Sequence, residues 1–564
     1  MKLLEKHFDL AFAAPDSVQK LRELILTLAM QGKLVPQDPK DQPASELLKE
    51  IEAEKQRLVE KGTFRDREDL EPSEIVKNFI IPKNWERCTI QNLGFVLGGK
   101  RLPNGHNYSE FPTAYRYLTV TNMKNKTIIN KEIKYIKPET YAEISKYVIT
   151  KNDLYITIAG TIGAVGSVPE SCDGMNLTEN AAKLVFSKCD KTFLVYLLNS
   201  KVVQDQFAAL TNKMAQPKLS LRSILSTLIP LPPLVEQRRI VTKIDRLMAR
   251  CDELEKLRGD RNQKRITIHT AALNRLLTAK ESDDFSTAWR FITQHFGELY
   301  SVKENVVELR KAILQLAVMG KLVPQDPKDE PASELLKAIE LEKQQLIKEG
   351  KVKTQKPLPK ISSEEIPYEL PKEWEWVRVI DMVDVGTGST PATTNSEYYN
   401  GNIPWYTSSS TNDSVAEKPE KFITEKAIKE TNCKIFPSGS LIIALYGQGK
   451  TRGQISEIVI PGATNQAIAA MIFYESSQKT KQYTKYYFVK IYDEIRSLAE
   501  GAAQPNLNVG KIKETLIPLP PLAEQRRIVA KIDQLMALCD RLEKQINAAT
   551  SKRTELLKAL MAQV

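Results

Sequence analysis

The chain has 564 residues, of which 42% are hydrophobic and 27% charged, so it can form about three to five domains with buried cores and is not a disordered chain. Lys and Arg number 81 against 70 Asp and Glu, which gives a net charge of +11 and a pI of 9.0. This excess favours a polyanionic partner, most simply nucleic acid, with an acidic protein as the alternative.

Membrane and secretory segments are not expected. No apolar run reaches the roughly 18–20 residues that a membrane-spanning helix needs. The first residues carry Glu5 and Asp9 inside their apolar stretch, which is unlike a signal peptide. The six cysteines never form CxxC, and only four histidines accompany them. This usage predicts free thiols in a cytoplasmic protein without a metal site.

The main signal is an internal repeat. GKLVPQDPKD occurs at 32–41 and again at 320–329, an offset of 288 residues. Between 32–55 and 320–343, 21 of 24 positions match, and between 227–256 and 515–544, 25 of 30 match. The chain therefore contains two tandem copies of one plan.

Between these matched segments the two copies differ. Residues 81–214 and 370–502 share only short features, such as IPKNW at 81–85 against LPKEW at 370–374. Uniform drift after a duplication would change all segments equally. The pattern instead predicts two near-identical scaffolds that carry two inserts with different specificities.

Each scaffold copy begins with two predicted helices. In the first copy, an apolar-rich helix over 21–30 stops at Gly32, and a second runs from Pro43 towards Gly62. Glycine after the last turn ends a helix because it accepts the left-handed conformation. The equivalent features of the second copy are the helix over 309–319, Gly320, Pro331 and Gly350.

The inserts mix short apolar strands with turns and a few helices, which predicts an α/β structure. Predicted strands lie at 115–122, 153–159, 403–407 and 441–446. Turns with glycine and basic or hydroxyl residues follow strands at 98–101, 160–163, 386–391 and 447–453. Such turns can hold phosphates, and their Asn, Thr, Ser and Arg side chains can reach base edges. The alternative is that they are ordinary solvated turns.

A long helix follows PLPPL in each copy, at 230–234 and 518–522. Nine of ten positions spaced by alternating four and three residues are apolar in the second copy, which predicts a coiled coil. These positions are Ile528, Ile532, Leu535, Cys539, Leu542, Ile546, Ala549, Arg553, Leu556 and Leu560. The first copy keeps the pattern at Ile240, Ile244, Leu247, Cys251 and Leu254, and loses it at Arg258. We predict that the two long helices pair antiparallel and that both cysteines are small core residues.

Catalytic motifs are not recognisable. Gly449, Lys450 and Thr451 resemble the end of a phosphate-binding loop, but Ala444 stands where that motif requires glycine. A methyltransferase would need a glycine-rich cofactor loop and an Asn-Pro-Pro-Tyr-like segment, and neither occurs. We predict that the chain is not an enzyme and has no catalytic residues.

With these residues in view, the chain resembles the specificity (S) subunits of type I restriction–modification enzymes. The resemblance is carried by IPLPPLxEQRRIVxKID at 229–245 and 517–533 and by the doubled GKLVPQDPKD. GNIPWYT at 401–407 and AQPNL at 503–507 resemble the family's target-recognition domains. In the first insert, Tyr117-Leu118 stands in place of Pro-Trp.

The resemblance implies a non-catalytic subunit that reads a split, asymmetric double-stranded DNA site. It implies two modification (M) subunits that use S-adenosylmethionine to methylate adenine, and restriction (R) subunits that use ATP and Mg. No cofactor is expected in this chain itself. Two alternatives stay open: a coiled-coil adaptor for proteins without a DNA role, and a stand-alone DNA-modifying enzyme.

The fold class implied is mixed α+β and α/β, with two recognition domains separated by long antiparallel helices and related by a pseudo-twofold axis. The predicted division has five parts, of which 81–225 (recognition domain 1) and 366–513 (recognition domain 2) read DNA. The scaffold parts are 1–80, 226–365 and 514–564.

Candidate site residues follow from the turns and the resemblance. The predicted DNA contacts are Lys100, Arg101, Thr119, Thr121, Asn122, Lys124, Ser389, Thr390, Trp405, Tyr406, Thr407, Ser408, Lys450 and Arg452. The starts of the long helices stayed alike while the inserts diverged, so we predict that they face outwards and bind the M subunits. These residues are Glu236, Gln237, Arg238, Arg239, Glu524, Gln525, Arg526 and Arg527.

Overall fold

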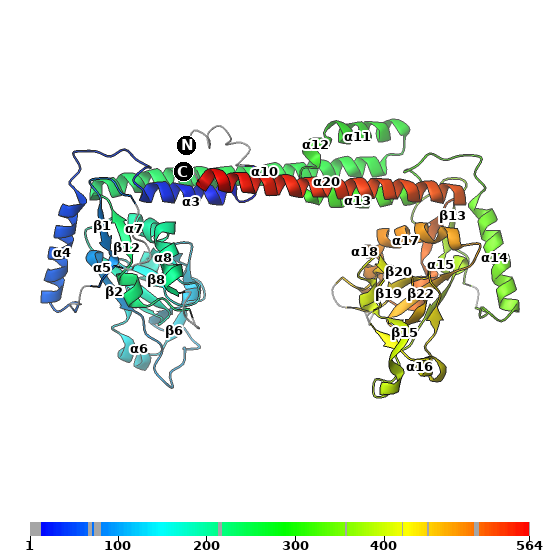
Figure 1. Ribbon diagram of the computed structural model, residues 1–564, viewed down its shortest axis with the longest axis horizontal. Coiled ribbons are helices and arrows are strands. Elements are labelled where there is room, and N and C mark those ends of the chain that lie inside the picture. The colour runs from blue at the N-terminus through cyan, green and yellow to red at the C-terminus, as the bar shows by residue number, and fades with distance from the viewer. Residues whose placement is uncertain are drawn as a thin grey trace. The chain divides into compact units, whose positions relative to one another are not determined.

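The computed structural model describes residues 13–65, 70–72, 80–211, 217–355, 358–419, 421–447, 450–500 and 507–562. The chain divides into two compact units (Figure 1). Unit 1 comprises Met1–Arg261 and Thr550–Val564, and unit 2 comprises Asn262–Ala549. Because 550 and 262 are 288 residues apart, each unit contains the same parts of the repeat.

Two long helices have residues in both units. Helix α10 (Leu234–Thr278) begins in unit 1 and ends in unit 2. Helix α20 (Leu522–Ala562) begins in unit 2 and ends in unit 1. Within unit 1, Leu557 and Leu560 near the end of α20 form a buried cluster with Ala14 and Leu24. Unit 1 is therefore completed by residues from the end of α20.

The scaffold helices end where the glycines predict. In unit 1, α3 (Ser17–Met30) stops before Gly32, whose φ is +67°, and α4 (Ala44–Glu60) stops before Gly62, also at +67°. A β-carbon on Gly32 would lie 2.3 Å from Cγ of Pro82. Glycine at this position thus ends the helix and lets the first residues of recognition domain 1 approach it. The equivalent helices of unit 2 are α13 (Lys303–Val318) and α14 (Ala332–Lys348).

Recognition domain 1 is built on small sheets with the strand orders β2-β11-β8-β9 and β6-β3-β10-β7. Strand β3 is parallel to β10, and the other neighbours in these two sheets are antiparallel. A third pair joins β1 to β12, and β4 and β5 form a hairpin. The strands are β1 (Glu86–Thr89), β2 (Gly94–Gly98), β3 (Tyr115–Leu118), β4 (Met123–Lys124), β5 (Thr127–Ile128), β6 (Lys134–Ile136), β7 (Val148–Ile149), β8 (Leu154–Thr157), β9 (Val165–Ser167), β10 (Met175–Leu177), β11 (Ala181–Phe186) and β12 (Leu228–Leu231). The helices are α5 (Ile90–Leu93), α6 (Pro138–Ile144), α7 (Lys191–Leu198), α8 (Lys201–Thr211) and α9 (Leu221–Leu225).

Recognition domain 2 repeats this design, with strand orders β14-β22-β19-β20-β16 and β17-β15-β21-β18 and the separate pair β13-β23. Its strands are β13 (Glu375–Arg378), β14 (Val383–Thr387), β15 (Tyr399–Tyr406), β16 (Val415–Ala416), β17 (Phe422–Ile423), β18 (Ile435–Phe436), β19 (Leu441–Ala444), β20 (Ile455–Ile458), β21 (Gly462–Thr464), β22 (Ile468–Phe473) and β23 (Leu516–Leu519). Its helices are α15 (Val379–Met382), α16 (Glu425–Glu430), α17 (Lys481–Lys490), α18 (Tyr492–Glu500) and α19 (Val509–Glu514). The predicted mixed α/β class is confirmed.

Several strand bounds differ from the prediction. Strand β3 ends at Leu118 instead of residue 122, because Val120–Asn122 form a short 3₁₀ turn. Strand β15 starts at Tyr399, ahead of the predicted residue 403. Strands β8 and β19 each end two residues early, where the polypeptide enters the turns that follow them. Between the two copies, unit 2 also contains α11 (Ser282–Gln294) and α12 (Phe296–Leu299).

The predicted core positions of the long helices are buried or half-buried, except Leu254 and Arg553. Ile240, Ile244 and Cys251 join the core of unit 1, and Ile528, Ile532 and Cys539 join that of unit 2. Burial raises the pKa of both thiols, which keeps them protonated as ordinary core side chains.

The pattern in α10 fails one position earlier than predicted. Leu254 is 46% exposed, so its assignment as a core position is wrong. At the next position, Arg258 donates hydrogen bonds to the carbonyl oxygens of Ala13 and Ala14, at 3.2 and 2.7 Å. Hydrogen bonds from Arg258 therefore replace apolar packing where α10 meets the residues just before α3. The predicted pseudo-twofold relation of the two units stays a prediction.

Candidate nucleic-acid interface

Four segments of recognition domain 1 meet at one end of its sheets. They are the turn after β2 (98–101), the 3₁₀ turn after β3 (119–122), the turn after β8 (158–163) and the β10–β11 turn (178–180). Backbone hydrogen bonds join them: Lys100 N to Leu177 O at 2.8 Å, Thr178 N to Leu118 O at 3.1 Å, and Ile158 N to Asn180 O at 2.8 Å. We call these four segments frame 1.

Recognition domain 2 has the same arrangement. Ser389 N donates to Thr464 O at 3.0 Å, Asn465 N to Tyr406 O at 3.0 Å, and Leu445 N to Ala467 O at 2.8 Å. These three bonds correspond one to one with those of frame 1, and the segments they join are frame 2 (387–390, 407–411, 445–447 with 450–453, and 465–467). By this correspondence, Lys100 of frame 1 is equivalent to Ser389 of frame 2, and Thr178 is equivalent to Asn465. The next residues, Arg101 with Thr390 and Glu179 with Gln466, then occupy equivalent positions.

A glycine holds the same place in both frames. A β-carbon on Gly99 would lie 2.1 Å from the carbonyl oxygen of Thr178, and one on Gly388 would lie 1.7 Å from that of Thr464. Both obstacles are backbone atoms, so only glycine allows this approach. The backbone of the turn is thus held constant while the side chains after it vary.

Replacement of Gly99 by Ala should therefore displace the turn that carries Lys100 and Arg101. We expect affinity for the specific DNA site to fall about tenfold or more, since the frame must open by more than an ångström. Gly98→Ala is the matched control, because its β-carbon would meet only Leu221 Cδ1 at 3.6 Å. Fluorescence anisotropy with duplex DNA checks this, and equal affinities of the two variants would contradict it.

The aromatic residues at the ends of β3 and β15 support the frames. Trp405 is 7% exposed and donates from Nε1 to the carbonyl oxygen of Ser389 at 3.3 Å. Tyr117 stands at the equivalent place and donates from its hydroxyl to the carbonyl oxygen of Lys100 at 2.7 Å. Tyr406 is fully buried and donates to Ile460 O at 2.9 Å. Both rings are core groups with internal partners, which argues against the predicted contacts of Trp405 and Tyr406 with DNA.

The 3₁₀ turns after β3 and β15 also use some predicted residues internally. Asn122 is buried, accepts from Thr119 Oγ1 at 2.9 Å and donates to Lys131 O at 2.9 Å. Its side chain is therefore a turn support and not a base-reading group, which corrects that assignment. Thr407, 288 residues beyond Thr119, makes the same kind of turn through the Ser410 hydroxyl, at 3.1 Å from the Thr407 N–H. Thr121 is exposed, and Ser408 is half-buried.

The basic residues of the frames reach solvent. Lys100, Arg101, Lys124 and Lys450 are exposed, and Arg452 is partly exposed. The turn that carries Lys450 and Arg452 is held by α18: the Tyr492 hydroxyl donates to Lys450 O, and Arg496 donates to Arg452 O at 3.2 Å. The structure thus brings Lys100, Arg101, Thr119 and Thr121 together in frame 1, with Ser389, Thr390, Thr407, Ser408, Lys450 and Arg452 together in frame 2.

The sequence predictions missed the segment between β10 and β11 and its counterpart in domain 2. Glu179 in one frame and Gln466 in the other face the turn after the glycine. The available signal was a short polar run between two apolar strands, TEN at 178–180 and NQ at 465–466.

The repeated starts of the long helices meet the other repeated motifs inside each unit. Glu236 accepts from Trp85 Nε1 at 3.0 Å and from Gln37 Nε2 at 2.7 Å. Arg239 forms a bidentate pair with Asp41, at 3.0 and 2.5 Å. We call these five residues clasp 1. It joins the helix to the PQDPKD segment and to the first residues of recognition domain 1.

Clasp 2 repeats this geometry. Glu524 accepts from Trp374 at 2.9 Å and from Gln325 at 2.7 Å, and Arg527 pairs with Asp329 at 3.1 and 2.6 Å. Burial raises the pKa of Glu236 and of Glu524, although the Trp and Gln donors oppose the shift. Each clasp joins three repeated motifs: the EQRR segment, the PQDPKD segment and the tryptophan at the start of the recognition domain. The clasps therefore explain why these motifs are alike in the two copies, since each motif contacts the EQRR segment.

The prediction that the whole EQRR segment faces outwards is wrong. Glu236 and Glu524 are each 1% exposed, and Gln237 and Gln525 are 0% and 1% exposed. Gln237 bridges the carbonyl oxygen of Pro232 and the backbone N–H of Asp190, at 2.9 and 3.0 Å. Arg238 and Arg526 are the members of the two segments that are exposed.

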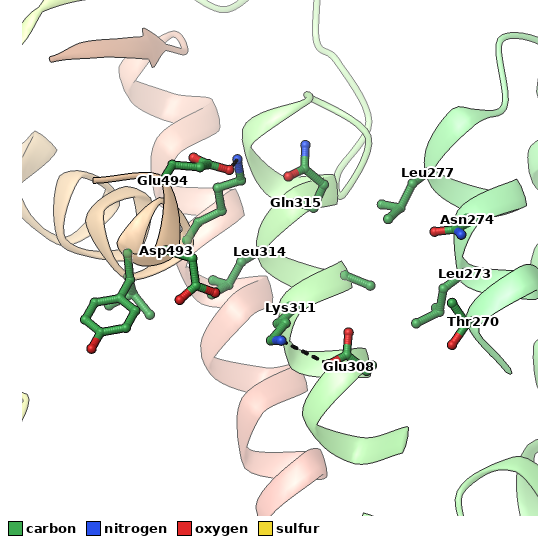
Figure 2. A pocket seen from close by; sticks show the side chains of 14 residues that line it. Thr270, Leu273, Asn274, Leu277, Glu308, Lys311, Leu314, Gln315, Asp493 and Glu494 are labelled. Carbon is green, nitrogen blue, oxygen red and sulfur yellow. Dashed lines mark hydrogen bonds and ion pairs between the residues drawn. The ribbon is translucent and has the colours of Figure 1, made fainter. Parts of the chain in front are cut away.

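Unit 2 contains a cavity of about 390 Å³. Figure 2 shows Asp493 and Glu494 of α18 on one side of Lys311 and Thr270 and Leu277 of α10 on the other. Lys311 is paired with Glu308 at 3.0 Å. No group of three or more metal-ligating side chains occurs within the described residues. We assign no cofactor to this cavity.

These features define a class of protein: a duplicated binding protein with two equivalent backbone frames that present different side chains. The family model described as Type I restriction modification DNA specificity domain matches residues 82–262 and 371–550. The chain is 32% identical over 563 residues to the Type I restriction enzyme EcoAI specificity subunit of Escherichia coli, covering 96% of this chain and 93% of that one. It is 30% identical over 562 residues to the EcoEI specificity subunit of the same organism, with the same coverage.

Among solved structures, the HsdS subunit from Thermoanaerobacter tengcongensis matches with a TM-score of 0.41 and 18% identity, over 86% of this chain and 97% of that one. The chain belongs to the family of type I restriction–modification DNA specificity subunits. It is the non-catalytic DNA specificity subunit of such a system and part of its complex. In the described part of the chain, no helix is long and apolar enough to cross a membrane.

Proposed function

We propose that this subunit reads a bipartite, asymmetric site in double-stranded DNA, with one half-site for each recognition domain. In the complex, two M subunits methylate adenine with S-adenosylmethionine, and R subunits cleave DNA with ATP and Mg; these cofactors bind the partners and not this chain. The proposed location is the cytoplasm. The proposed division of the chain is that of the sequence analysis, with recognition domains at 81–225 and 366–513.

One observation carries the proposal: the two frames share their backbone hydrogen bonds but differ in the side chains they present. Frame 1 presents Lys100 and Arg101 where frame 2 presents Ser389 and Thr390. Direct readout of bases depends on the donors and acceptors that side chains offer. Two frames with unlike side chains should therefore read unlike half-sites.

Mapping of methylated adenines in the host genome by long-read sequencing tests this. We expect a split motif whose halves differ and lie about one helical turn apart, on the order of 10 bp centre to centre. A continuous motif, or a perfectly palindromic one, would overturn the proposal.

Partner binding is proposed for Arg238 and Arg526, because both are exposed while the rest of each EQRR segment is held internally. Arg238→Glu should release one M subunit, and Arg238→Glu with Arg526→Glu should release both, since like charges would then face the same partner surface. Native mass spectrometry of the purified complex counts the subunits. Lys137→Glu, an exposed charge reversal outside the clasp, is the control. Two M subunits retained by the double variant would refute the assignment.

A further inference from the structure

The frames differ most in one pair of facing side chains. In frame 1, Arg101 Nε donates to Glu179 Oε1 at 2.8 Å. In frame 2, at the equivalent positions, the Thr390 hydroxyl donates to Gln466 Oε1. The backbone around both pairs is the same, because Gly99 and Gly388 make the same close approach. An ion pair in one domain thus replaces a neutral hydrogen bond in the other.

The frame 1 pair holds a guanidinium by one edge. Glu179 is fixed from behind, since its Oε2 accepts from the Thr178 hydroxyl at 2.9 Å. The Arg101 side chain is 77% exposed and pairs with Glu179 through Nε. Within the described part of the chain, the two terminal nitrogens of Arg101 make no hydrogen bond or ion pair. The terminal N–H donors of Arg101 are therefore available to a ligand.

The frame 2 pair holds an amide in the same way. Thr390 uses one lone pair of Gln466 Oε1, and the Gln466 side chain is exposed. The second lone pair of Oε1 and the Nε2 donors remain available. Gln466 therefore offers one acceptor beside one donor, whereas Arg101 offers two donors.

These two patterns fit different bases. Guanine presents two acceptors, O6 and N7, in the major groove, and a guanidinium binds both. Adenine presents the N7 acceptor beside the N6 donor, and a glutamine amide binds both. Resting on the proposed function, we propose that each pair supplies one base-reading residue from opposite members, Arg101 for guanine in one half-site and Gln466 for adenine in the other. Glu179 and Thr390 are positioning residues that orient them.

The test exchanges the pairs in the intact complex with its M subunits. Arg101→Thr with Glu179→Gln should change one position of the first half-site from guanine to adenine and leave every other position unchanged. Thr390→Arg with Gln466→Glu should change one position of the second half-site from adenine to guanine. Methylated-adenine mapping of cells expressing each variant reads both motifs. Lys137→Thr is the control, because β6 is antiparallel to β3 and places Lys137 beyond the end of the sheet opposite to frame 1.

A second measurement separates base reading from phosphate binding. Arg101→Ala should lower affinity for the specific duplex about ten- to a hundredfold and leave affinity for duplex with adenine at that position unchanged. An equal loss for all duplexes would show that Arg101 holds a phosphate and would overturn the assignment. Unchanged motifs in both exchange variants would also overturn it. A bipartite wild-type motif would in either case leave the proposed function standing, whereas its absence would refute that function independently.

Discussion

A chain in which residues 370–505 are replaced by a second copy of 81–216 should direct methylation to a symmetric site made of the first half-site twice. The exchanged segments begin at equivalent points, since Trp85 donates to Glu236 in clasp 1 and Trp374 donates to Glu524 in clasp 2 through the same indole nitrogen. The strand pairs β1–β12 and β13–β23 also have the same register, with Glu86 opposite Leu231 and Glu375 opposite Leu519. Each domain therefore closes on the scaffold through matching contacts.

The reciprocal chain, with 370–505 in both places, should give a symmetric site made of the second half-site. Methylated-adenine mapping reads both results, and the change is complete replacement of half of the motif. Retention of the wild-type motif, or loss of methylation by a folded chain that still binds two M subunits, would show that the domains do not read DNA independently.

Loss of the clasp carboxylate should have the largest effect on stability. In the Glu236→Ala variant, the buried Trp85 indole N–H and the Gln37 amide lose their acceptor, and we expect unit 1 to be destabilised by about 3 kcal/mol. Glu236→Gln is the matched control, because an amide oxygen can still accept from Trp85. Hydrogen exchange followed by mass spectrometry should show faster exchange in 81–89 and unchanged exchange in 370–378. Glu524→Ala should give the reverse pattern.

The stability difference between the wild-type chain and Glu236→Gln should depend on pH. Burial raises the pKa of Glu236 in the folded chain, so the ionised carboxylate is less favourable there than in the unfolded chain. The contribution of this group to stability is therefore present at acidic pH and is lost as pH rises through the folded pKa. Relative to Glu236→Gln, the wild-type chain should gain stability as pH falls through that value. A difference that does not change with pH would contradict the buried position of the carboxylate.

Local signals in the sequence predicted the scaffold well. Gly32 and Gly320 end helices where predicted, and Ile240, Ile244, Ile528 and Ile532 are buried where their spacing indicated. These features depend on neighbours within a few turns of the same helix, so a single stretch of sequence contains the information. The prediction that Leu254 is buried was wrong because its burial depends on the segment that faces it. At this end of the pattern, the facing segment presents carbonyl oxygens, which Arg258 binds.

The clasps and frames could not be predicted because their partners are distant in the chain. Glu236 meets Trp85 and Gln37, which precede it by 151 and 199 residues, and a glutamate at a helix start otherwise looks solvent-exposed. The likeness of the two frames lies mainly in backbone hydrogen bonds, and Gly99 and Gly388 are the residues that the close approach requires in both. Small length differences also shift the register, so that Lys100 corresponds to Ser389, 289 residues later, and Thr178 to Asn465, 287 residues later.

The shared long helices also impose an order on synthesis. Unit 2 is one continuous segment, Asn262–Ala549, so it can fold as soon as that segment has left the ribosome. Unit 1 begins to emerge first, yet Leu24 and Ala14 must wait for Leu557 and Leu560 at the far end of α20. The half of the protein that is translated first is therefore completed last. Until then, the apolar residues of α3 that pack against α20 lack their partners, and an exposed apolar face of this kind is prone to aggregation.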